Sequence, residues 1–121
     1  PLVGASVKSP PALPVPLLYV DDDEDFLLLL ETVLPNHGFL VTTVTSCAAA
    51  REALGGQQFP VVVADAALPD GNGISLLAPL GSLRVVVSGA PADSASGGRW
   101  DLRFEKPVDV DDLAQSILAR L

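Results

Sequence analysis

Four positions along the chain carry side chains that could together do phosphoryl chemistry. The acidic run DDDED at 21–25 follows the apolar stretch LLYV at 17–20. Asp65 and Ser88 each end a later apolar stretch, and Lys106 follows another. Carboxylates that lie close together raise one another's pKa, so a cation such as Mg²⁺, which prefers oxygen ligands, would hold them ionised. A carboxylate nucleophile, a hydroxyl and a lysine beside that cation predict a site that accepts a phosphoryl group.

These side chains meet only if the elements between them build a parallel sheet. From residue 17 onward, strand-like stretches that are apolar on both faces alternate with helix-like stretches. This pattern is typical of a parallel sheet covered by helices on both sides, whose strands end at one shared edge. The expected strands are 17–20, 39–44, 61–64, 83–87 and 102–104. The expected helices are 26–37, 46–54, 74–80 and 109–121.

Residues with known end preferences set the bounds of these helices. Pro35 lies in the last turn of the first helix, and Gly38 is expected to be its C-terminal cap. Ser46 is expected to cap the second helix, which Gly55 and Gly56 should stop. Asp109 is expected to cap the last helix in the same way as Ser46.

Three stretches are expected to lie outside helices and strands. Residues 1–16 contain five prolines and predict an extended linker, which hints at a further domain on the N-terminal side of the domain at 17–121. The PDGNG stretch at 69–73 predicts a turn, in which the glycines would adopt positive φ. Residues 89–99 occupy the place of a fourth helix, but three glycines and a proline favour a loop or a frayed turn.

Composition excludes several classes of protein. The chain has 121 residues, 49% of them apolar, which is enough for one domain with a core. A net charge of -8 with scattered bases argues against binding to nucleic acid. No apolar run approaches the roughly 18 residues of a membrane span, so a cytoplasmic protein is expected. Cys47 and His37 are the only residues of their types, which excludes metal sites built from several of either.

Four stretches of the chain resemble the receiver domain of two-component response regulators. They are LLYVDD at 17–22, VVVADAALPDGNG at 61–73, VVVSGA at 85–90 and FEKPV at 104–108. The resemblance covers residues 17–121. It implies a flavodoxin-like, doubly wound, five-stranded parallel α/β sheet in the order 2-1-3-4-5, here with a short or eroded fourth helix.

The resemblance also implies a role for each residue of the site. Asp65 would be the phosphoacceptor. Mg²⁺ would be held by Asp22, Asp65 and the Ala67 carbonyl, with help from Asp21 through water. Ser88 would be the switch hydroxyl and Lys106 would contact the phosphoryl group, with a cis peptide bond between Lys106 and Pro107.

The chain departs from the family pattern at several positions. Arg103 stands three residues before Lys106, where an aromatic switch residue is usual, and it is expected to be exposed on the edge strand. Phe104 has the opposite strand parity and should point into the core. Ala67 and Ala90 cannot hydrogen-bond an attacking water, so slow self-dephosphorylation is expected.

Three functions fit these residues. The first is a phosphoaccepting switch, not an enzyme, that takes its phosphoryl group from a histidine kinase or a histidine phosphotransfer protein. The second is a docking module with the receiver fold that is never phosphorylated. The third is a phosphatase of the haloacid-dehalogenase type, in which Asp21 would be the nucleophile. Replacing Asp65 and Asp21 separately distinguishes the first function from the third.

Overall fold

The computed structural model describes residues 14–89 and 100–121, which form a parallel sheet between two layers of helices. The five strands lie in the order β2-β1-β3-β6-β7, which confirms the predicted 2-1-3-4-5 order for the main sheet. Their bounds are Val15–Val20 for β1, Phe39–Val44 for β2, Val61–Asp65 for β3, Leu83–Ser88 for β6 and Leu102–Glu105 for β7. Every neighbouring pair is parallel, so all five strands end at one edge.

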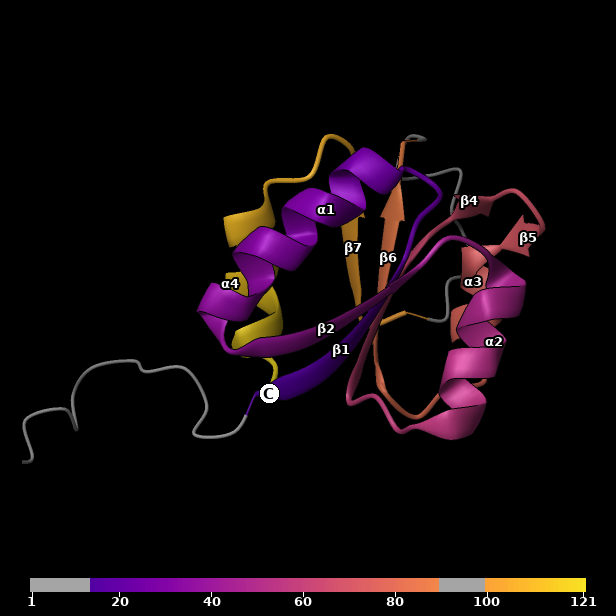
Figure 1. Cartoon of the computed structure of the whole chain (residues 1–121), viewed down its shortest axis with the longest axis horizontal. Helices are drawn as coiled ribbons and strands as arrows, with labels where there is room; N and C mark the ends of the chain where they lie inside the picture. The colour runs from indigo at the N-terminus through magenta and orange to yellow at the C-terminus, as the bar shows by residue number, and fades with distance from the viewer. Residues whose placement is uncertain (1–13, 90–99) are drawn as a thin grey trace, which may run out of the picture.

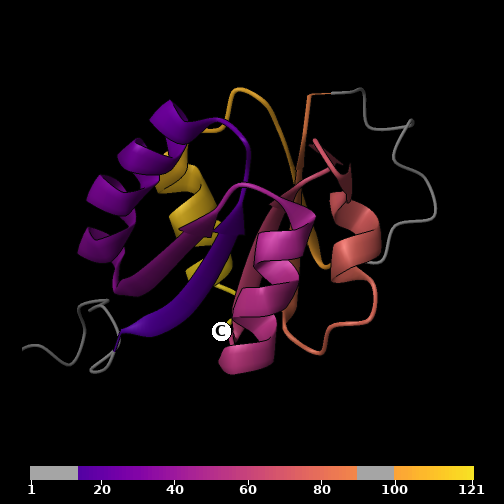
Figure 2. The same cartoon turned by 45° about the vertical axis from the view of Figure 1, so that its right-hand side comes forward.

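The helices cover both faces of the sheet, as expected for a doubly wound fold. Helices α1 (Glu24–Val33) and α4 (Val110–Leu118) lie on one face. Helices α2 (Cys47–Gly56) and α3 (Gly73–Leu77) lie on the other (Figures 1 and 2). Successive strand residues point to opposite faces, so β1, β2, β3 and β6 each contribute to two hydrophobic clusters. In β1, for example, Tyr19 belongs to the first cluster and Val20 to the second.

The first helix is divided where the sequence predicted one continuous element. Helix α1 begins after Asp23, whose carboxylate accepts a bond from the Phe26 N–H at 3.1 Å. It passes into a 3₁₀ turn, η2, at Leu34–His37. Pro35 has no N–H to donate to the α-helical ladder, which explains the change at this point. Gly38 then ends the helix with φ of 93°, as predicted for a C-terminal cap.

Other element ends differ from the predictions by a few residues. Strand β1 begins at Val15 and so includes two residues that were assigned to the linker. Ser46 caps α2 as predicted, but the helix runs through both glycines to Gly56 because neither needs a positive φ there. Helices α3 and α4 end three residues earlier than predicted, at Leu77 and Leu118.

A short hairpin between β3 and α3 was missed. Strands β4 (Ala67–Leu68) and β5 (Gly71–Asn72) pair antiparallel, and only β5 lies within the stretch 69–73 that was predicted as a turn. The expected positive φ is wrong for this stretch, since Gly38 alone has it among the residues described. Gly73 is required for a different reason: a Cβ there would clash with the carbonyl oxygen of Asp65. The main chain of α3 therefore lies directly against the end of β3.

Two predictions fall largely on undescribed residues. The expected loop at 89–99, and with it the short or eroded fourth helix, lies outside the described residues except for Gly89. Trp100, which was expected to pack beneath that helix, packs against the second hydrophobic cluster. Within residues 14–89 and 100–121, none of the helices is both long and apolar enough to span a bilayer.

Candidate functional site

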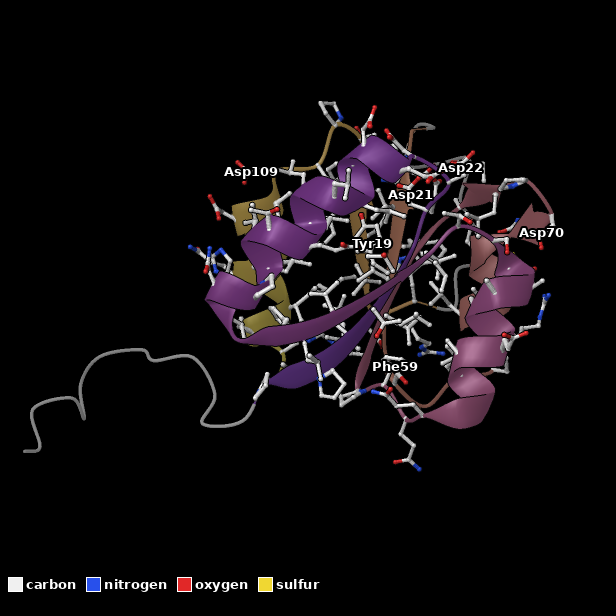
Figure 3. All side chains as sticks on the ribbon, viewed as in Figure 1. Tyr19, Asp21, Asp22, Phe59, Asp70 and Asp109 are labelled. Atoms are coloured by element: carbon white, nitrogen blue, oxygen red, sulfur yellow. The ribbon has the colours of Figure 1, made fainter. Side chains whose placement is uncertain are left out.

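The site residues predicted from sequence gather at the carboxyl edge of the sheet. Asp21 and Asp22 follow β1, Asp65 ends β3, Ser88 ends β6 and Lys106 follows β7. These four strands are consecutive neighbours in the sheet. Figure 3 shows Asp21 and Asp22 at the end of the molecule toward which the parallel strands point. The fold therefore brings three acids, a hydroxyl and a lysine from distant parts of the chain to one place.

Lys106 makes the closest ionic contact of the site. Its Nζ lies 2.5 Å from Oδ2 of Asp65 and 3.5 Å from Oδ2 of Asp21. The backbone N–H of Lys106 donates to the carbonyl of Ser88 at 3.0 Å, which anchors the lysine to the end of β6. Burial lowers the pKa of Lys106, but its contacts with Asp65 and Asp21 outweigh burial and raise it. The lysine is therefore a fixed positive charge beside the proposed phosphoacceptor.

Asp21 is fully buried, and its carboxylate is incompletely satisfied. Oδ1 accepts a bond from the Asp23 N–H at 3.0 Å. Oδ2 has no hydrogen-bond partner among the described residues, and its ion pair with Lys106 is long. Burial is the main cause that raises the pKa of Asp21, and the charges of Asp65 and Asp22 add to it. A buried carboxylate oxygen whose long ion pair is with a lysine shared with Asp65 indicates a place for a further positive charge.

The three carboxylates have the geometry of a metal site. One oxygen from each of Asp21, Asp22 and Asp65 lies within 4.8 Å of the others. When all three are ionised, Lys106 balances only one of the three negative charges. A hard dication with oxygen ligands fits the remaining charge and the incompletely satisfied Oδ2 of Asp21. Mg²⁺ matches this donor set, since it uses few protein carboxylates and keeps several waters.

The remaining predicted site residues lie close to this cluster. Ser88 is buried at the end of β6. Ala67 lies in β4, with an exposed side chain, and its N–H donates to Oδ1 of Asp65 at 3.0 Å. The peptide bond between Lys106 and Pro107 is cis, as the resemblance implied. The metal-binding role of the Ala67 carbonyl and the switch role of Ser88 stay predictions.

A hollow opens beside the cluster and gives it access to solvent. Its volume is about 370 Å³, and it lies between the loop after β1 and the loop after β7. Its walls are both charged and apolar, formed by Asp21, Asp23, Phe26, Lys106, Pro107 and Val108. Asp21 and Lys106 are the two members of the site that line this hollow.

The strand that precedes Lys106 carries the departures from the family pattern. Phe104 packs against the first hydrophobic cluster, which confirms that it points into the core. The interpretation of Arg103 as exposed is wrong, because only 14% of its side chain is accessible. Its guanidinium Nη1 lies 3.7 Å from Oε1 of Glu105, which has the same parity on β7. The prediction for Ala90 lies outside the described part of the chain.

Two contacts near the site were not anticipated from sequence. Asp70, at the tip of the missed hairpin, accepts two hydrogen bonds from the first turn of α2. The only sequence signal was an Asp inside a stretch of turn residues, and such residues are common in turns. His37 makes the second contact: its Nε2 lies 2.8 Å from Oδ1 of Asp111, which joins η2 to α4.

Comparisons with known proteins agree with this arrangement. The sequence model of the response regulator receiver domain matches residues 17–96. Protein PetR of Rhodobacter capsulatus is 45% identical over 65 residues, which is 54% of this chain and 27% of PetR. The photosynthetic apparatus regulatory protein RegA of Cereibacter sphaeroides is 31% identical over 114 residues, covering 86% of this chain and 61% of RegA. This chain therefore spans less than two thirds of either relative.

The solved structures show the same fold. A CheY-like response regulator receiver domain from Methylobacillus flagellatus superposes with a TM-score of 0.77 at 25% identity, covering 88% of this chain and 98% of that one. The agreement of sequence, sheet order and acidic cluster leads to one conclusion. The chain belongs to the response regulator receiver domain family.

Proposed function

We propose that this domain is a phosphoaccepting switch and not an enzyme, and that Asp65 receives the phosphoryl group. The contact between Lys106 Nζ and Asp65 Oδ2, beside two further carboxylates in a receiver fold, is the observation that carries this proposal. An isolated turn aspartate would need neither the lysine contact nor the acidic neighbours. The family and its relatives support two-component signalling as the setting.

The proposed donor is a phosphohistidine on a histidine kinase or a histidine phosphotransfer protein. An oxygen of Asp65 attacks the phosphorus, a P–O bond forms, and the P–N bond breaks. The electron pair of that bond leaves on the imidazole nitrogen, which takes up a proton. Because Asp65 is no longer a free carboxylate, Lys106 contacts the phosphoryl oxygens instead. Mg²⁺, held by Asp22, Asp65 and the Ala67 carbonyl with help from Asp21 through water, would supply positive charge to the same oxygens.

Ser88 and Ala67 complete the proposal. Ser88, at the end of β6 and one strand away from Asp65, would turn its hydroxyl toward the new phosphoryl group. The Ala67 side chain is a methyl group and cannot hold a water for hydrolysis. Slow loss of the phosphoryl group therefore stays a prediction, and following the phosphorylated mass over time checks it. A lifetime of seconds would contradict it.

The test is the intact mass of the protein after incubation with acetyl phosphate, with and without Mg²⁺. The wild type should gain one phosphoryl group only when Mg²⁺ is present, and Asp65→Asn should gain none. If the wild type gains no mass and consumes no donor, the domain acts as a docking module with the receiver fold. If Asp65→Asn still consumes the donor and Asp21→Asn does not, the protein is a phosphatase of the haloacid-dehalogenase type.

A further inference from the structure

The tip of the β4–β5 hairpin is fastened to a helix that takes no part in the acidic cluster. Both oxygens of the Asp70 carboxylate accept backbone bonds from α2, from the Cys47 N–H at 2.8 Å and the Ala48 N–H at 3.0 Å. Figure 3 shows Asp70 beside the end of α2 at which the helix begins. These two bonds lower the pKa of Asp70, so the carboxylate is ionised at neutral pH.

Helix α2 already has an N-terminal cap without Asp70. The Ser46 hydroxyl already accepts a bond from the Ala49 N–H at 3.1 Å, as an ordinary N-terminal cap does. Asp70 binds two other N–H groups of the same turn, and it comes from a different element, 23 residues further along the chain from Cys47. Its bonds therefore join the hairpin to the body of the domain, because Cys47 and Ala50 are fully buried.

The base of the same loop is also fixed, and the proposed metal ligand lies between the two attachments. At the base, the Ala67 N–H donates to Asp65, and the Gly73 N–H donates to the Ala66 carbonyl at 3.0 Å. Contact between Gly73 and the carbonyl of Asp65 leaves no room for a side chain. Ala67, in β4, is thus held from one side by the phosphoacceptor and from the other by Asp70 through the hairpin.

We infer that Asp70 is a positioning residue, which fixes the β4–β5 hairpin against α2 so that the Ala67 carbonyl stays placed to bind Mg²⁺. The inference rests on the proposed function, since it concerns the metal of that site. Replacing a group that hydrogen-bonds to a metal ligand typically changes metal affinity about 10- to 100-fold, and Asp70, which acts on Ala67 through the hairpin, should lie at the low end of this range. Asp70→Ala should therefore weaken Mg²⁺ binding although Asp70 does not belong to the acidic cluster.

Ser46→Ala is the matched control. Both substitutions remove a side-chain cap from the first turn of α2, but only Asp70→Ala also releases the hairpin. Titration calorimetry should give a Kd for Mg²⁺ about tenfold or more weaker in Asp70→Ala than in the wild type. Ser46→Ala should stay within about twofold of the wild type, and Asp70→Asn, which keeps one acceptor oxygen, should fall between.

A second measurement needs no metal. Without Mg²⁺, the amides of residues 66–72 should exchange with deuterium faster in Asp70→Ala than in Ser46→Ala, after both are matched for global stability. Equal Mg²⁺ affinities in Asp70→Ala and the wild type would overturn the role of Asp70 and leave the phosphoacceptor proposal intact. A wild type that binds no Mg²⁺ would overturn both.

Discussion

At the scale of single residues, the charge balance around Asp21 decides how the site behaves without metal. Asp21 is buried, its Oδ2 lacks a hydrogen bond among the described residues, and Lys106 is shared with Asp65. Burial therefore destabilises the ionised form of this carboxylate in the folded protein. Groups with such shifted pKa values are typical of functional sites, where a ligand supplies the missing interaction.

Asp21 should make the metal-free protein relatively more stable as the pH falls. Its pKa is raised above 3.8 by burial first, so the folded state binds this proton more tightly than the unfolded chain. The free energy of unfolding of the wild type, relative to Asp21→Asn, should rise as the pH falls from about 7 toward about 4. Urea unfolding in the presence of a chelator measures this difference.

Asp101 supplies a control of opposite sign. Hydrogen bonds from Arg84 lower the pKa of Asp101, so its stabilising contribution is present above 3.8 and is lost as the pH falls through the lower folded value. The free energy of unfolding of the wild type, relative to that of Asp101→Asn, should therefore decrease as the pH falls. The same difference relative to Asp21→Asn should increase. Parallel pH curves for the wild type and Asp21→Asn would contradict the raised pKa.

At the scale of elements, the site depends on how closely α3 approaches β3. Helix α3 begins at Gly73, directly against the carbonyl of Asp65, and Asn72 caps it through the Ile74 N–H at 2.7 Å. A helix that starts so close to the phosphoacceptor constrains the backbone on which Asp65 lies. The absence of a side chain at residue 73 makes this approach possible.

Gly73→Ala should disturb both stability and phosphorylation. Its new methyl group would meet the backbone oxygen of Asp65, which cannot move aside as a flexible side chain could. We expect a loss of roughly 1–3 kcal/mol in the free energy of unfolding, measured by urea denaturation, and slower phosphorylation by acetyl phosphate. Unchanged stability would show that β3 and α3 are less tightly apposed than the structure indicates.

Gly55→Ala is the matched control for this substitution. Gly55 also lies in a helix, but a Cβ there would meet nothing within 4 Å and its φ is not positive. The alanine should stabilise the protein by about 0.4–1 kcal/mol, because it restricts the unfolded chain. Phosphorylation should be unaffected, since α2 contacts the hairpin at its other end.

At the scale of the whole molecule, metal binding should be linked to folding. The cluster combines acids from the ends of β1 and β3, so it exists only when the sheet is formed. A chain with a net charge of -8 also gains from neutralising three close carboxylates. Mg²⁺ that binds the folded protein alone must stabilise it.

Mg²⁺ should therefore raise the melting temperature in proportion to the logarithm of its concentration above Kd. At about 100 times Kd the expected gain in the free energy of unfolding is ~2.7 kcal/mol. Thermal unfolding at increasing Mg²⁺ measures it. Asp22→Asn removes an exposed ligand without changing the core, and Mg²⁺ should raise its melting temperature less than that of the wild type. Equal responses in the two proteins would exclude Asp22 as a ligand.

Apolar runs and helix-capping residues predicted the strands of the sheet and several helix ends. Runs apolar on both faces indicated the five parallel strands, since a strand covered by helices on both sides needs them. Ser46, Asp109 and Gly38 marked helix ends because their side chains, or the lack of one, satisfy the terminal backbone groups. The edge of the sheet where the site residues meet followed from strand direction alone.

The tertiary structure decided what depends on contacts between distant segments. The incompletely satisfied Oδ2 of Asp21, the shared Lys106 and the partial burial of Arg103 arise from packing across the sheet, which spacing along the chain does not encode. The fastening of the hairpin to α2 by Asp70 is of the same kind. Sequence by itself determined which residues could form a phosphoryl site and at which edge, because strand polarity is local. Their distances and charges came only from the folded chain, because they depend on several elements packing together.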